Sequence, residues 1–108
     1  MKIFVNLKSA HEHYNYSSSH RFGTIGNEKG VIRSYSNGKN CDKILKDGKL
    51  IYYRLKNEKV KEMYKININS KRKIRFFSKI KEGVLDMGLY LPVSILEKSQ
   101  SFIKLIKV

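Results

Sequence analysis

The 108-residue sequence has one cysteine, one proline and no tryptophan, and its acidic residues are few beside the basic ones. Cys41 cannot form a disulfide within the chain, and no spacing of cysteine and histidine is typical of a zinc site. No apolar run approaches the ~20 residues of a membrane-spanning helix, and residues 1–7 are too short a stretch for a signal peptide. These absences exclude a disulfide scaffold, a zinc module and a membrane protein, and they predict a reduced, cytoplasmic protein.

Basic residues, by contrast, are abundant. The chain has 23 Lys and Arg against 9 Asp and Glu, a formal net charge of +14. The first 54 residues contribute +6 (10 minus 4) and the rest +8 (13 minus 5), so the charge is spread along the whole sequence. The length suits a single domain, residues 1–108. A field of this sign attracts polyanions, nucleic acids above all, although a solvated lysine-rich surface is the simpler alternative.

Short segments rich in strand-forming residues recur along the chain, with hairpin-type turn signals at Asn37-Gly38 and Asp47-Gly48. We expect strands at residues 31–35, 49–55, 73–80, 84–93 and 101–108, with the fourth interrupted at Gly88 and ending near Pro92. Residues 1–7 are expected to form an opening strand or a short element, and residues 57–65 a short helix. Loops are expected at residues 9–20 and 23–30. The pattern predicts a mainly β (α+β) fold, a small barrel or strongly curved sheet with one or two short helices. Residues 1–20 are expected to form a flexible or peripheral segment.

The expected strand at residues 73–80 carries a run of cations at its start. Strand alternation directs the side chains at positions 74 and 76 to one face and those at 75 and 77 to the other. Lys71, Lys73 and Arg75 therefore share a face on which they could meet the phosphates of a nucleic-acid backbone. The alternative is a strand edge that lysines protect from aggregation.

Three other patterns carry weaker signals. The three histidines between residues 11 and 20 favour a polar loop over a metal site, because no second cluster of ligands accompanies them. The glycines of residues 23–30 lack the Gly-Lys-Ser/Thr ending of a P-loop. Glu58-Lys59 does not supply the Glu-x-Lys on a strand after an Asp that a two-metal nuclease needs. The sequence therefore predicts no metal, no cofactor and no catalysis.

Seven tyrosines lie among the cations: Tyr14, Tyr16, Tyr35, Tyr52, Tyr53, Tyr64 and Tyr90. Aromatic rings interleaved with cations suit base stacking, although core packing is the commoner role. Tyr52 and Tyr53 are neighbours in an expected strand and so point to opposite faces. One of the two can therefore lie in the core while the other faces a ligand or solvent.

Four short motifs follow one another along the chain, in residues 30–33, 46–53, 73–77 and 86–93. The succession resembles the SRA (YDG-type) domains, the modified-DNA readers of modification-dependent restriction enzymes. Those domains pass from a glycine-bearing strand through an Asp-Gly-x-Ile-Tyr-Tyr type segment to Val-Arg-Val-Phe and then Tyr-x-Gly-Leu-Tyr-x-Val. The last two are matched here by Ile-Arg-Phe-Phe (74–77) and Met-Gly-Leu-Tyr-Leu-Pro-Val (87–93). The similarity spans residues 23–95, and the family's acidic cluster is reduced here to Cys41-Asp42 and Asp47.

The resemblance implies a PUA-like curved β-barrel with flanking helices that binds duplex DNA and turns a base out of the stack into a pocket. By motif position it implies a base pocket near Ser34, Tyr35, Asp42, Tyr52 and Tyr53. It also implies phosphate contacts from Arg33, Lys71, Arg72, Lys73 and Arg75.

We therefore expect a DNA-binding module that reads a modified base in duplex DNA and positions a fused or associated restriction nuclease or ATPase. Three alternatives stay open. The first is an RNA-binding PUA-like or ribosome-associated domain, the second a small phage-type inhibitor that binds a protein, and the third a small metal-dependent nuclease. A preference for duplex DNA over structured RNA would separate the main expectation from the first alternative.

Overall fold

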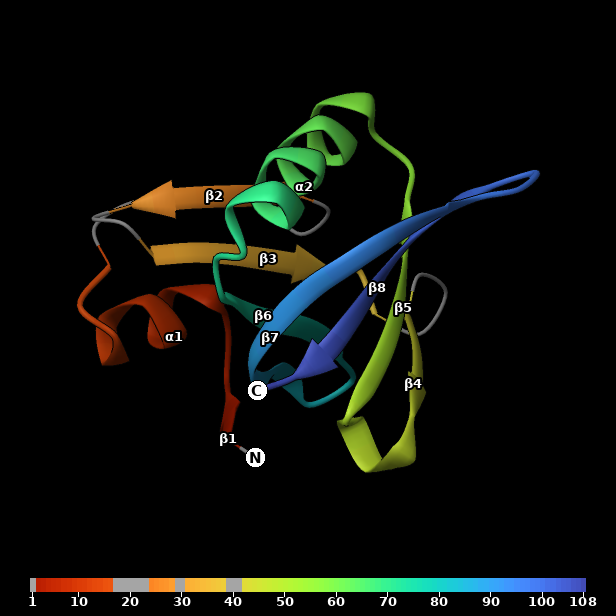
Figure 1. Cartoon of the computed structure of the whole chain (residues 1–108). Coiled ribbons are helices and arrows are strands. Elements are labelled where there is room, and N and C mark those ends of the chain that lie inside the picture. The colour runs from red at the N-terminus through yellow and green to blue at the C-terminus, as the bar shows by residue number, and fades with distance from the viewer. Residues whose placement is uncertain (1, 17–23, 29–30, 39–41) are drawn as a thin grey trace.

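The computed structural model describes residues 2–16, 24–28, 31–38 and 42–108 (Figure 1). These residues form eight strands, two α-helices and one 3₁₀ turn. In chain order the elements are β1 (Lys2–Phe4), α1 (Leu7–His13), β2 (Thr24–Glu28), β3 (Val31–Ser36), β4 (Asp42–Leu45), the 3₁₀ turn η1 (Lys46–Gly48), β5 (Leu50–Leu55), α2 (Glu58–Ser70), β6 (Ile74–Ile80), β7 (Gly83–Glu97) and β8 (Ser101–Lys107).

All eight strands belong to one sheet, whose order is β2-β3-β6-β7-β8-β5-β4, with β1 paired to β7. The β3–β6 pair is parallel, and the other described pairs are antiparallel. The long strand β7 joins two halves, because its first part pairs with β1 and β6 and its second part with β8. Register shifts between Phe76 and Phe77 on β6, and between Pro92 and Ser94 on β7, mark irregularities of the bulge type that bend a sheet.

The sheet buries its larger hydrophobic cluster on the face that α2 covers, which we call the inner face. Val60 and Tyr64 of α2 pack there against side chains from β3, β5, β6, β7 and β8. The buried members of the cluster are Ile32, Ile51, Tyr53, Leu55, Val60, Tyr64, Ile74, Phe76, Met87, Tyr90, Ile103 and Leu105. This cluster holds both halves of the sheet to one helix.

A smaller cluster lies on the opposite face of β3, β6 and β7, which we call the outer face. Ala10 of α1 is buried there against Tyr35, Phe77 and Val84. Phe4, Leu7, Tyr14 and Tyr16 pack around these residues. Because α1 and β1 cover only this half of the outer face, the described residues leave the face of β4, β5, β8 and the second part of β7 without a helix over it. In Figure 1, α1 lies at the left of the molecule, whereas β4 and β5 lie at the right.

Both helices begin at an asparagine cap. The side chain of Asn6 accepts a hydrogen bond from the Ser9 backbone N–H at 2.8 Å, and that of Asn57 accepts one from Lys59 at 2.8 Å. Helix α2 ends at Lys71, which adopts a left-handed conformation with φ 54°. None of the described helices is long and apolar enough to cross a membrane.

The structure confirms the expected mainly β fold with two short helices, as one curved sheet whose edges β2 and β4 are not paired to each other in the described residues. The structure contains the strands expected at residues 31–35, 49–55, 73–80 and 101–108, and the observed ends lie within one residue of the expected ends. The Asp47-Gly48 hairpin is also confirmed, since it joins β4 to β5.

Five expectations are wrong. Residues 7–13 form a helix in place of part of the loop at 9–20, and residues 24–28 form a strand in place of a loop. Asn37-Gly38 does not close a hairpin, because β3 pairs with β2 and β6 while β4 pairs with β5. Strand β7 continues past Gly88 and Pro92 to Glu97, and α2 extends to Ser70. The position of His20 lies outside the described residues.

Candidate nucleic-acid interface

The predicted base-pocket residues Ser34 and Tyr35 lie on opposite faces of β3, and both are buried. On the inner face, Ser34 Oγ accepts a hydrogen bond from the hydroxyl of Tyr64. On the outer face, the ring of Tyr35 stacks on Phe77 with 5.3 Å between centroids. The Tyr35 hydroxyl lies 2.9 Å from Nε2 of the buried His11 on α1. Both side chains are thus part of the packed interior.

The other predicted pocket residues are also divided between faces. Tyr53 is buried on the inner face, where its ring meets Phe76 edge-on at 5.5 Å. Tyr52 is half-buried on the outer face of β5. Asp42 pairs with Tyr53 in the β4–β5 ladder. The structure therefore does not bring the five predicted residues around one cavity, and their role as a base pocket stays a prediction.

Three of the predicted phosphate ligands form a basic turn between α2 and β6. Lys71 and Lys73 are exposed, and Arg72 is half-buried. This turn leads into β6 beside the start of β3, since Ile74 pairs with Ile32. The two lysines are accessible to an anion approaching that end of the sheet.

The remaining two, Arg33 and Arg75, lie under aromatic rings on the outer face. Arg33 is fully buried, with its guanidinium carbon 4.3 Å from the centre of the Tyr16 ring. The guanidinium carbon of Arg75 lies 4.5 Å from the centre of the Tyr14 ring. Both cations thus stabilise the packing of the segment after α1 on the sheet, and their predicted contact with phosphates stays a prediction.

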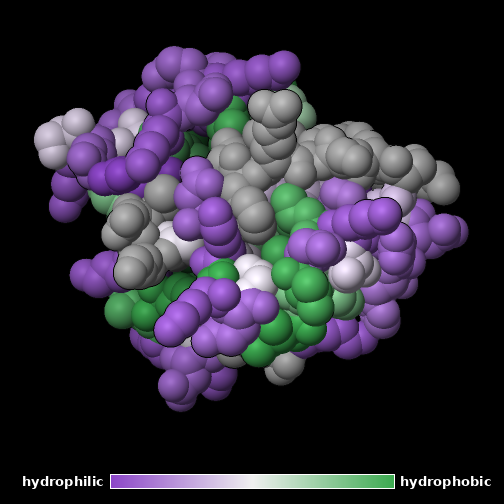
Figure 2. Space-filling model, turned by 180° about the vertical axis from the view of Figure 1, so that it is seen from behind, coloured by the Kyte–Doolittle hydropathy of each residue, from purple (hydrophilic) through white to green (hydrophobic). Residues whose placement is uncertain are grey.

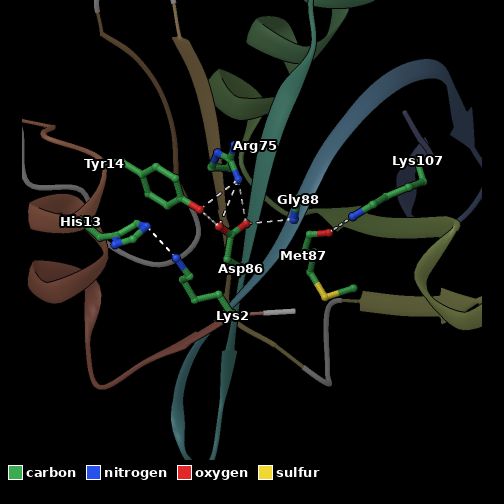
Figure 3. Close-up of polar contacts among 8 residues, drawn as sticks. All are labelled: Lys2, His13, Tyr14, Arg75, Asp86, Met87, Gly88 and Lys107. Carbon is green, nitrogen blue, oxygen red and sulfur yellow. Dashed lines mark hydrogen bonds and ion pairs between the residues drawn. The ribbon is translucent and has the colours of Figure 1, made fainter.

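Arg75 is also part of a polar cluster around Asp86 (Figure 3). The Nη1 atom of Arg75 lies 3.0 Å and 3.2 Å from the two carboxylate oxygens of Asp86, which is 5% exposed. The Gly88 backbone N–H donates to the same carboxylate at 2.9 Å, and the Tyr14 hydroxyl donates to it as well. Burial, followed by the hydrogen bond to Asp86, raises the pKa of Tyr14 to about 12. Tyr14 therefore stays a hydrogen-bond donor at neutral pH.

An open groove of about 640 Å³ lies where the inner face opens between β4 and the end of β6. Its apolar walls come from Ile44, Ile80 and Leu85. Asn37 and Ser78 supply polar groups, and Lys79 and Lys81 lie beside them. A volume of this size falls in the usual range of ligand-binding pockets. The groove is mostly apolar. In the view from behind, hydrophilic residues cover much of the face, and hydrophobic residues gather mainly in its lower half (Figure 2).

Sequence reasoning did not find this groove, because its residues come from three separate segments of the chain. Asn37 follows β3, and Ile44 belongs to β4. The other lining residues come from the end of β6, from the turn after it and from the start of β7. The one local signal was Asn37-Gly38, a pair typical of a hairpin turn. Gly38 has φ 98°, and a Cβ atom there would collide with the carbonyl oxygen of Lys79. This glycine therefore permits the close approach of β6 to the segment after β3, at the groove.

The described residues contain no group of three His, Cys, Asp or Glu side chains arranged to hold a metal ion. Nε2 of His13 accepts a hydrogen bond from the Lys2 ammonium at 2.7 Å, and His11 contacts Tyr35. These two histidines are thus engaged within the fold of the N-terminal segment.

No protein-family model matches the chain, and no curated protein matches it in sequence. Solved structures do match its fold. A SUVH5 SRA complex with hemimethylated CG DNA aligns with TM-score 0.64 and 18% identity, over 84% of this chain and 86% of that one. SUVH5 SRA complexes with fully methylated and fully hydroxymethylated CG DNA align with TM-scores 0.65 and 0.61, each at 18% identity over 92% of this chain and 82% of theirs. The chain has the fold of an SRA domain.

Proposed function

We propose that this chain is a DNA-binding module that takes a modified base of duplex DNA into the groove of the inner face. In this role it positions a fused or associated nuclease or ATPase on modified DNA and carries out no reaction of its own. The observation that carries the proposal is the shared fold with SRA domains solved in complex with methylated and hydroxymethylated CG DNA. The net charge of +14 supports the same partner, because cations dominate affinity for DNA.

The chemistry of the groove supports a base that carries an added methyl group. A base turned out of the duplex loses stacking and pairing, and it must regain contacts in its pocket. The apolar walls formed by Ile44, Ile80 and Leu85 would bury the methyl group, while Asn37 and Ser78 offer hydrogen bonds to the base edge. Burial of one methyl group contributes about 0.8 kcal/mol, which corresponds to an affinity difference of about fourfold.

The proposal is tested by titrating the protein with matched duplexes: unmodified, hemimethylated and fully methylated at cytosine, hydroxymethylated, and methylated at adenine. We expect one modified duplex to bind at least about fourfold more tightly than the unmodified one. A 2-aminopurine placed beside the modified base should brighten on binding, because unstacking relieves its quenching. The protein alone should leave the DNA uncut.

Two substitutions separate the groove from the rest of the surface. Ile44 is 43% exposed, so Ile44→Ser should fold normally and should remove most of the preference for the modified duplex while unmodified DNA binds as before. Ile66→Ser on α2, at a residue 62% exposed, is the matched control and should keep the preference. Equal affinity for every duplex and for structured RNA would contradict the proposed function.

The cations at the two ends of β6 are proposed phosphate contacts. Lys79 and Lys81 lie at the groove, and the basic turn with Lys71 and Lys73 lies about 20 Å away along the strand. We expect each double alanine variant, at 79 and 81 or at 71 and 73, to lower the salt dependence of log Kd by ~1.8, because each phosphate contact contributes ~0.9. Binding should weaken equally for modified and unmodified duplexes.

The control for this prediction is Lys59→Ala with Lys65→Ala, which removes two exposed charges from α2. If this control lowers the slope as much as the β6 variants, general charge and not contact at β6 governs binding. An unchanged slope for both β6 variants would place the DNA elsewhere.

A further inference from the structure

The half of the outer face that α1 leaves uncovered presents aromatic rings between cations. Strand register aligns Lys43, Tyr52, Lys104 and Ser94 in one row across β4, β5, β8 and β7. The next row consists of Arg54, Phe102 and Leu96. Their sequence neighbours Ile51, Tyr53, Ile103 and Leu105 are buried on the inner face, so strand alternation directs both rows outward.

The side chains of these rows are accessible in the part of the chain that the structure describes. Lys43 is exposed, Leu96 is 38% exposed, and Tyr52, Lys104 and Phe102 are half-buried. Glu97 projects to the other face, where it forms an ion pair with Lys61 of α2. The described residues of the two rows therefore include three cations and no carboxylate.

The second row ends at a polar hollow beside the turn between β7 and β8. The hollow, of about 450 Å³, is lined by Arg54, Leu55, Lys56, Ser99, Gln100 and Ser101. The Nη1 atom of Arg54 donates to Gln100 Oε1 at 3.4 Å, a long hydrogen bond. Its Nε atom is buried and has no hydrogen-bond partner among the described residues. A guanidinium beside a lysine and two serine hydroxyls suits a phosphate group.

We propose that this face, which we call the aromatic face (Lys43, Tyr52, Arg54, Phe102 and Lys104), binds single-stranded DNA. Tyr52 and Phe102 offer rings on which unpaired bases can stack, and the cations beside them can hold the intervening phosphates. Duplex DNA does not expose the faces of its bases, so it gains only the charge contacts here. This inference does not rest on the proposed function, because the aromatic face and the groove lie on opposite faces of the sheet.

The chemistry favours DNA over RNA and over an acidic protein. Recognition of RNA uses contacts to the 2′-hydroxyl, and apart from the Tyr52 hydroxyl the two rows offer only Ser94 as an uncharged hydrogen-bonding side chain. An acidic peptide would match the cations but would leave both rings without a stacking partner. A single DNA strand uses both parts of the face.

The test measures binding of the full chain to fluorescein-labelled dT15 by anisotropy. Tyr52→Leu should weaken binding at least fivefold, because stacking on one aromatic side chain contributes that much or more. Tyr52→Phe should retain it, since the ring is kept. Lys43→Ala with Lys104→Ala should lower the salt slope by ~1.4, or ~0.7 per phosphate, whereas Lys59→Ala with Lys65→Ala on α2 should leave the slope unchanged.

The chain contains no tryptophan, so a Tyr52→Trp variant supplies a reporter should Tyr52→Leu fail to fold. Its fluorescence should be quenched by dT15 and not by a blunt hairpin duplex or by polyglutamate. The proposal is overturned if dT15 leaves this fluorescence unchanged, if Tyr52→Leu binds as the wild type does, or if rU15 or polyglutamate binds more tightly than dT15. Ile44→Ser, which should remove most of the preference for the modified duplex, should leave dT15 binding intact. Failure of the groove and failure of the aromatic face are therefore distinguishable.

Discussion

Arg75→Leu is expected to lower the free energy of unfolding by about 3 kcal/mol. The substitution leaves the carboxylate of Asp86 at 5% exposure without its cation. The hydroxyl of Tyr14 and the N–H of Gly88 still donate to that carboxylate, so the cost falls at the lower end of the range for a broken buried ion pair. Urea denaturation followed by circular dichroism measures the change.

The double variant Arg75→Leu with Asp86→Leu is the informative comparison. It removes both charges together, so it should be less destabilised than the sum of the two single variants, as a coupled pair requires. Single variants within about 1 kcal/mol of the wild type would contradict a structural role for the pair. In that case, a weaker salt dependence of DNA binding in the Arg75→Leu variant would support the predicted contact of Arg75 with a phosphate.

Gly38→Ala should destabilise the protein by more than about 2 kcal/mol and should also remove the preference for modified DNA. At φ 98° a side chain is strained, and its Cβ would collide with the backbone carbonyl of Lys79, which cannot move without shifting β6. Because Asn37 and Lys79 both line the groove, the shift would reshape it. Thermal unfolding and the duplex titration measure the two effects.

Gly88→Ala is the matched control for this prediction. Gly88 has the same φ of 98°, but a Cβ there would meet only the flexible end of the Lys107 side chain. Lys107 would lose its hydrogen bond to the Met87 carbonyl and its position over the Tyr90 ring. We expect a smaller loss of stability than for Gly38→Ala and an unchanged preference among duplexes. Equal losses for both glycines would show that backbone strain alone, and not contact with Lys79, sets the cost.

Local patterns in the sequence predicted the parts of the fold that local physics decides. The alternation at residues 74–77 was confirmed because Ile74 and Phe76 pack on the inner face while Phe77 packs on the outer. The hairpin at Asp47-Gly48 was confirmed because the turn itself sets the pairing of β4 with β5. These features depend on a few neighbouring residues.

Features that depend on distant contacts were missed. Residues 66–70, Ile-Asn-Ile-Asn-Ser, have low helix propensity, yet α2 continues through them because Asn67 is buried and donates to the Met63 carbonyl at 2.8 Å. Helix α1 has no clear apolar period, and it is held by the burial of Ala10 and His11 against the sheet. Asn37-Gly38 looked like a hairpin turn because nothing local indicates the parallel pairing of β3 with β6.

In the candidate site, too, local patterns were predicted and contacts between distant residues were missed. Strand alternation correctly separated Tyr52 from Tyr53, with Tyr53 buried and Tyr52 on the other face. It could not show that Arg33 and Arg75 lie beneath tyrosines from the segment after α1, since those contacts join residues far apart in the chain. The groove was beyond sequence reasoning for the same reason.

The central position of β7 has a consequence for the order of events during folding. Among the described residues, strand β1 pairs with residues 84–86, and β6 and β8 both pair with β7. A nascent chain that has not yet exposed residues 83–97 can form the β4–β5 hairpin and α2, but it cannot complete the sheet. Such non-local pairing slows folding. The edges of β1 and β6 that wait for β7, and the edge of β5 that waits for β8, are therefore exposed to other chains until residues 83–107 have been synthesised.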